Sequence, residues 1–151
     1  MTHDPPGAGI ICLDGLGTAA FVAVTAVAAA WRRDAADLAS LAVSGVLFVG
    51  GCVAFTVGFL RAVGRSRTED VDIAGVVYLT GSAPRPVRRA LLGLWFLQIG
   101  VATASVFAVQ PPFGVMAPMW GIGLITVWAS QHGTFPPRPA EDRLGRRSAP
   151  Q

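Results

Sequence analysis

Four long apolar stretches, almost free of charge, dominate the pattern of hydrophobic and polar positions. They run from about 13 to 31, 38 to 60, 90 to 109 and 113 to 131. A bilayer core about 30 Å thick needs roughly 20 apolar residues in a helix that rises about 1.5 Å per residue. Because each stretch meets that length, the pattern predicts four transmembrane helices rather than a soluble bundle.

The connections between the stretches predict how the helices are arranged. The first connects to the second, and the third to the fourth, through only a few residues, so each pair should form an antiparallel hairpin. We therefore predict an all-α fold, an integral membrane antiparallel four-helix bundle at 13–132. A short N-terminal segment (1–12) precedes it, a loop (61–89) joins the hairpins, and the tail (133–151), rich in proline and arginine, is predicted to be disordered.

Composition and charge agree with a membrane protein. Hydrophobic residues make up 52% of the chain and charged residues 14%, whereas soluble domains carry about 25% charged residues. The net charge of +3 could indicate nucleic acid. The arginines flank the apolar stretches instead of gathering on a polar face, so we expect a lipid bilayer as partner and no nucleic acid.

The arginines also predict the orientation of the helices. Ten of them lie in the central loop and the tail, at positions 61, 65, 67, 85, 88, 89, 138, 143, 146 and 147, whereas Arg32 and Arg33 alone lie in the opposite connections. Positive residues collect on the cytoplasmic side of membrane proteins. The N-terminus, the central loop and the C-terminus are therefore expected in the cytoplasm.

The central loop contains an apolar run, residues 73–79, after an acidic start. Seven residues are too few to span a bilayer. The segment 68–89 could lie in the membrane interface, or it could dock on the bundle as a short helix or an extended segment. The sequence leaves both arrangements open.

Small residues recur at every fourth position in two of the predicted helices. They are Gly50, Ala54, Gly58 and Ala62 in the second stretch, and Gly100 and Ala104 in the third. Residues four apart share a helix face, and small side chains let another helix backbone approach closely. We predict helix-packing faces here. The pattern does not distinguish contacts within one chain from contacts between chains.

Three polar residues are candidates for a functional role. Asp14 could be a proton- or cation-coupling group, but its place at the edge of the first stretch favours a helix N-cap. Gln98, midway along the third stretch, could form a hydrogen bond to a neighbouring helix or line a polar path, although a packing role is favoured. His132 could titrate near neutral pH or bind metal. A contact with the C-terminal dipole of the fourth helix is favoured, where Gly133 should end that helix.

The arginines before the third stretch could bind anionic lipid head groups or a partner. They are Arg85, Arg88 and Arg89. The simpler interpretation is that they only set the orientation of the chain. The sequence contains no nucleotide-binding glycine loop, no nucleophile with a histidine partner and no metal-ligand cluster. We therefore predict no enzymatic activity, no catalytic or metal site and no cofactor.

Two short motifs resemble those of a known group of proteins. Residues 128–138 resemble a closing motif W-x-x-x-H-G-x-F-P-x-R, and residues 81–89 resemble G-S-A-P-x-x-V-R-R. With the four-span layout, they are similar to a group of small four-span actinobacterial membrane proteins. The resemblance covers about the second half of the chain by motif. It implies a multi-pass protein of the bacterial inner (plasma) membrane, and it implies no activity.

Two functions are compatible with these features. The favoured one is a structural or interaction protein, either an accessory or assembly partner of a membrane complex or a homo-oligomer. The alternative is a small oligomeric transporter or channel, which needs a polar stripe through the bundle. The apolar stretches offer scattered Ser, Thr and Gln residues but no charge expected to be buried, which weighs against the alternative.

Overall fold

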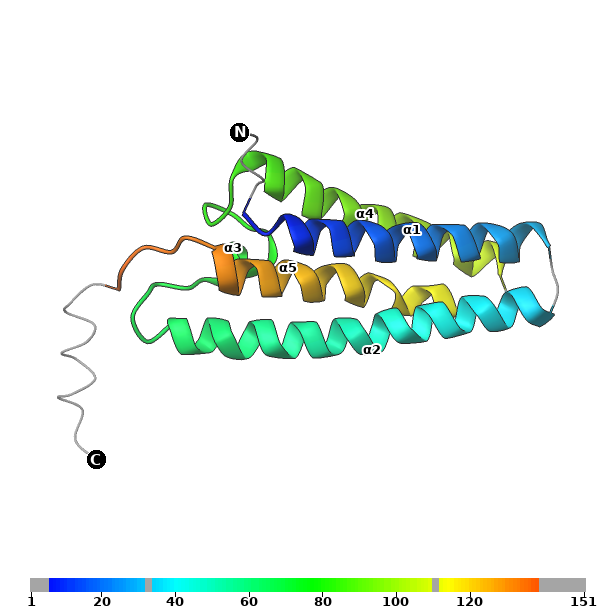
Figure 1. Ribbon diagram of the computed structural model, residues 1–151, viewed down its shortest axis with the longest axis horizontal. Helices are drawn as coiled ribbons and strands as arrows, with labels where there is room; N and C mark the ends of the chain where they lie inside the picture. Colours follow the sequence, from blue (N-terminus) through cyan, green and yellow to red (C-terminus); the bar gives the residue numbers. More distant parts are fainter. Residues whose placement is uncertain (1–5, 32–33, 110–111, 139–151) are drawn as a thin grey trace, which may run out of the picture.

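The computed structural model describes residues 6–31, 34–109 and 112–138, and this part of the chain is helical, without a β-strand (Figure 1). Its elements are α1 (Ala8–Ala30), α2 (Asp34–Arg65), α3 (Ile73–Val77), α4 (Arg85–Ala108), the 3-10 helix η1 (Phe113–Met116) and α5 (Pro118–His132). Within these residues, α1, α2, α4 and the segment η1–α5 are each long and apolar enough to cross a membrane. The protein is therefore an all-α, multi-pass membrane protein.

The four long helices alternate in direction and form an antiparallel bundle. Figure 1 shows that α1 and α4 begin, and α2 and α5 end, at one end of the bundle, beside α3. We call this the loop end. Helix α5 is the most buried member, because it packs on α1, α2 and α4. In its apolar window 56% of the residues are buried, against 22–28% in the other spans.

The helices extend beyond the apolar stretches, which corrects several predicted boundaries. α1 begins at Ala8, so residues 8–12 belong to the first helix instead of a separate N-terminal segment. α2 continues to Arg65, and α4 already begins at Arg85, so both ends of the predicted loop are helical. Apolar length measures only the part of a helix that fits the bilayer core, whereas backbone hydrogen bonds continue past it.

Glycines bring α2 and α5 into backbone contact. A Cβ on Gly51 would collide with the Met119 carbonyl group, and one on Gly58 would lie 2.6 Å from the carbonyl carbon of Thr126. From the other side, a Cβ on Gly123 would collide with the Gly51 carbonyl oxygen. Because no side chain separates the two helices at these levels, α2 and α5 form the most extensive interface of the bundle.

The small-residue row predicted on α2 lies along this interface with a shift of one residue. Gly58 and Ala62 are buried, whereas Gly50 and Ala54 are half-buried. Gly50 lies against the indole ring of Trp120. A Cβ on Gly50 would be 2.9 Å from the nearest ring carbon. Gly51, outside the predicted row, makes the closest backbone contact.

The small residues of α4 lie on the outer surface. Gly100 and Ala104 are exposed, and a Cβ on Gly100 would meet nothing within 4 Å. Gly93, two turns before Gly100, is equally open. This face is therefore exposed, with open space at both glycines, within the described part of the chain.

The central loop docks on the bundle, which resolves the alternative that the sequence leaves open. Asp72 caps α3 by accepting a hydrogen bond from the Gly75 N–H at 2.8 Å. Val76 and Leu79 are buried in a hydrophobic cluster with Trp128 of α5. Leu79 has a left-handed backbone (φ 54°), a conformation that is unfavourable for leucine and that its full burial offsets.

Candidate functional site

A polar cluster joins three helices in the interior of the bundle. The Gln98 Nε2 of α4 donates to Asp14 Oδ1 at 3.0 Å and to Thr18 Oγ1 at 2.7 Å, both in α1. The Gly121 N–H of α5 donates to Gln98 Oε1 at 3.1 Å. Asp14, Thr18 and Gln98 are at most 2% exposed. We call these three side chains and the Gly121 amide the polar core.

The hydrogen bonds of the polar core fix the direction of every donor. A backbone N–H can only donate, so the Gln98 oxygen must face Gly121 and the Gln98 amide nitrogen must face α1. The Thr18 hydroxyl donates to the Asp14 carbonyl oxygen at 2.8 Å, so it accepts from Gln98. Each donor of Gln98 and Thr18 is therefore already in use.

Asp14 is not the helix N-cap that its place in the sequence favours. The N-cap of α1 is Gly7, and Asp14 lies seven residues further on, inside the helix and 0% exposed. At about 1.5 Å per residue, it lies roughly 10 Å along the helix from the cap. The expectation that the bundle buries no charged residue type is therefore wrong. Gln98 makes hydrogen bonds to two neighbouring helices, one of the possibilities raised for it.

Other polar side chains continue the polar core toward the opposite end of the bundle. Those buried are Thr25, Ser40, Ser44 and Ser105. The hydroxyls of Thr25 and Ser44 have no hydrogen-bond partner among the described residues. Apolar packing interrupts the series, because Phe21 is fully buried between Thr18 and Thr25 on the same face of α1. The interior is thus polar in patches, not along an open path.

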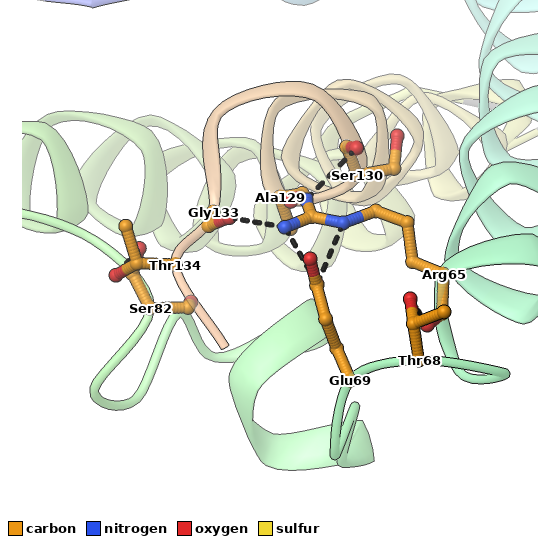
Figure 2. A network of polar contacts seen from close by, with 8 residues as sticks. All are labelled: Arg65, Thr68, Glu69, Ser82, Ala129, Ser130, Gly133 and Thr134. Atoms are coloured by element: carbon orange, nitrogen blue, oxygen red, sulfur yellow. Dashed lines mark hydrogen bonds and ion pairs between the residues drawn. The ribbon is translucent and has the colours of Figure 1, made fainter. Parts of the chain in front are cut away.

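A second polar cluster closes the loop end and is centred on Arg65, the last residue of α2 (Figure 2). Its guanidinium group donates to the carbonyl oxygens of Ser130 at 3.1 Å and Gly133 at 2.8 Å, which belong to the last turn and cap of α5. It also pairs with Glu69 at 2.7 Å and lies 5.1 Å above the Phe135 ring. Arg65 thus caps a helix whose final carbonyls have no partner within the helix.

The first residues of the tail are docked, which corrects the prediction of a disordered tail for residues 133–138. The Asp70 N–H donates to the Pro136 carbonyl oxygen at 2.8 Å, and the Arg138 N–H donates to that of Thr68 at 3.1 Å. The Thr134 N–H donates to the Ser82 carbonyl oxygen at 3.0 Å. Residues 139–151 of that predicted segment lie outside the described residues. We call the contacts of Arg65, Glu69, Ser82 and residues 133–138 the loop-end junction.

The two sequence motifs meet at this junction, through Ser82 of one and Thr134 of the other. The Ser82 hydroxyl also donates to the Gly75 carbonyl oxygen of α3 at 2.6 Å. Gly133 caps α5, as expected. The contacts of these motif residues hold together the loop, the tail and α5, so they act as structural connectors.

His132 lies exposed in the last turn of α5, the position expected for a contact with the helix dipole. Its ring centroid lies 5.7 Å from that of Trp128. The Trp128 indole N–H donates to the Pro6 carbonyl oxygen at 2.9 Å, which ties the start of α1 to α5. No cluster of three or more His, Cys, Asp or Glu residues that could hold a metal occurs in the described ranges.

The three arginines predicted to contact anionic lipid or a partner lie together at the start of α4. Arg85, Arg88 and Arg89 are exposed and, with Leu92, line a surface hollow of about 320 Å³. Arg88 Nε donates to the Tyr78 carbonyl oxygen at 3.0 Å, which attaches the docked loop to α4. One of the three therefore has a structural contact as well.

Comparison with known proteins gives no assignment. No protein-family model, no curated protein and no solved structure matches the chain. The resemblance to small actinobacterial membrane proteins accordingly stays a prediction.

Sequence reasoning missed Thr18 as a partner of Asp14, and Arg65 and Glu69 as a pair. The i,i+4 spacing within each pair is the signal that could have found them.

Proposed function

We propose that the protein is a structural or interaction protein of the membrane, an accessory or assembly partner of a membrane complex or a homo-oligomer. The observation that supports this proposal is the outer face of α4, where Gly93, Gly100 and Ala104 share one exposed side of the helix. A Cβ on either glycine would meet nothing within 4 Å in the described chain.

The energetics of glycine favour a contact at this face. A glycine in a helix costs about 0.5–1 kcal/mol relative to alanine. On α2 the cost is offset by backbone contact with α5, but α4 shows no such contact at Gly93 or Gly100. Small residues on a lipid-facing helix are typical of close helix–helix association. Exposed Leu97 and Phe107 lie on the same side of α4 and would add packing area.

Replacing Gly100 by leucine is expected to abolish stable association while leaving the monomer folded, because leucine would hold a second backbone away from α4. The measurement is co-purification of an untagged copy, and of other membrane subunits, with a tagged copy in mild detergent. The matched control is Gly45→Leu on α2. Gly45 is also open, but its neighbours at i−4 and i+4 are Leu41 and Val49, so it belongs to no small-residue row.

Equal co-purification of the wild type, Gly100→Leu and Gly45→Leu would exclude α4 as the interface. A wild-type protein that stays monomeric and carries proton-dependent flux in liposomes would contradict the interaction function altogether.

A small oligomeric transporter or channel is the second candidate function. One observation favours it, namely that Asp14 is buried with Gln98 and Thr18 in the bundle interior. Ionisable residues within membrane spans often belong to transport pathways. The fully buried Phe21 interrupts the polar residues within one chain, so a pathway would require further chains.

We further propose that the loop end faces the cytoplasm of a bacterial plasma membrane. Ten of the twelve arginines belong to the central loop and the tail, against Arg32 and Arg33 in the opposite connection. A reporter that is active only in the cytoplasm should therefore be active when fused after Gln151. It should be inactive when inserted between Arg33 and Asp34. The reverse pattern would overturn this orientation.

A further inference from the structure

The carboxyl group of Asp14 is half-satisfied, although the neighbouring Gln98 and Thr18 side chains use all of their hydrogen-bond donors. Oδ1 accepts from Gln98, whereas Oδ2 is buried and has no hydrogen-bond partner among the described residues. The donors of Gln98 and Thr18 are committed elsewhere. The polar core therefore offers one neutral hydrogen bond to a carboxylate that, if ionised, would need several.

Among the described residues, no charged side chain pairs with Asp14. α2, α4 and α5 pack on α1, and in the described chain none of their ionisable residues forms an ion pair or hydrogen bond with Asp14. The ionisable residues of these three helices lie near the helix ends. They are Arg61 and Arg65 at the end of α2, Asp34 and Asp37 at its start, Arg85, Arg88 and Arg89 at the start of α4, and His132 at the end of α5. The Gln98 amide of α4 donates to Asp14, and the Gly121 N–H of α5 donates to Gln98.

A second orphan polar group borders the same turn of α1. The Trp120 indole lies where a Cβ on Gly17 would be, one turn after Asp14. Its N–H is buried and unpartnered within the described residues. The Trp120 N–H therefore makes no hydrogen bond to Asp14, and as a neutral donor it supplies none of the positive charge that an ionised carboxylate would require.

We propose that Asp14 is a buried proton-binding site, a neutral carboxylic acid at neutral pH with its proton on Oδ2. This assignment keeps Oδ1 as the carbonyl oxygen that accepts from Gln98, and it places the hydroxyl on Oδ2, which receives no hydrogen bond. An isolated ionised carboxylate in an apolar interior costs so much free energy that the group takes up a proton instead. Release of that proton requires water or a cation to reach Oδ2.

Infrared spectroscopy of the full chain in lipid vesicles tests this proposal. At neutral pH, the difference spectrum between the wild type and Asp14→Asn should contain the C=O stretching band of a carboxylic acid, which is wholly lost in the variant. The matched control is Asp34→Asn, since Asp34 is exposed at the start of α2. Its difference spectrum should contain only carboxylate bands.

A carboxylate band in the Asp14→Asn difference spectrum at neutral pH would overturn the proposal. If that variant fails to fold, wild-type protein with ¹³C-labelled aspartate gives the same answer, because an isotope-shifted acid band must be present. Exchange of sodium for choline should leave the band unchanged. A band that appears only after sodium is removed would assign a cation site and equally contradict a proton site.

Discussion

Replacing Gly51 by alanine is expected to destabilise the bundle by about 2–3 kcal/mol, the upper range for overpacking a tight interface. The added Cβ would collide with the Met119 carbonyl group and lie 2.6 Å from the backbone nitrogen of Trp120. Both are backbone atoms of α5 and cannot rotate away. α2 and α5 would have to separate, which also strains the contact at Gly58.

The measurement is reversible unfolding of the purified protein in mixed micelles titrated with a denaturing detergent. Gly45→Ala is the matched control in the same helix, because a Cβ at Gly45 meets nothing within 4 Å. Its better helix propensity should stabilise the protein by roughly 0.5–1 kcal/mol. The two variants should therefore move the midpoint in opposite directions. Equal effects would show that the backbone contact between α2 and α5 is not the tightest point of the bundle.

Replacing Arg65 by alanine is expected to open the loop-end junction at a cost of about 2 kcal/mol, since hydrogen bonds to a charged donor contribute about 1.5–3 kcal/mol. The variant leaves the Ser130 and Gly133 carbonyls without their donor and Glu69 without its cation. Arg65→Lys should recover only part of the loss, because one ammonium group cannot reproduce the planar fork of donors.

Hydrogen exchange of the backbone amides of Asp70, Thr134 and Arg138 measures this opening, because these amides bond across the junction. A loss of about 2 kcal/mol corresponds to roughly thirtyfold faster exchange. Arg61→Ala, one turn earlier on α2 and exposed, is the control and should leave exchange unchanged. Unchanged exchange in Arg65→Ala would mean that the junction is held by its backbone bonds alone.

Arg65 also shows what an arginine count can and cannot reveal. Counting assigned it, with nine others, to one side of the membrane. The count does not reveal which of the ten arginines bonds to the end of a helix. That contact exists because α2 continues as far as Arg65 and because α5 ends beside it. Arg65 caps α5 only because the ends of α2 and α5 lie side by side.

The sequence by itself determined the number of membrane-spanning helices, their approximate positions and their alternating direction. Apolar length against bilayer thickness is a local property, and it suffices for these features. It likewise determined that Gly133 ends α5 and that Gln98 is suited to an interhelical hydrogen bond.

The tertiary structure alone decided which residues are inside. Asp14 reads as a helix cap because the predicted stretch begins at about residue 13, whereas the apolar residues 8–12 form the first turn and a half of α1. Gly51 rather than Gly50 makes the backbone contact, because helix rotation about its axis depends on all the neighbours together. Gly100 and Ala104 show the same small-residue spacing as α2 but face outward, since α5 already fills the interior of the bundle. Periodicity defines a helix face, and only packing against other helices decides whether that face is buried.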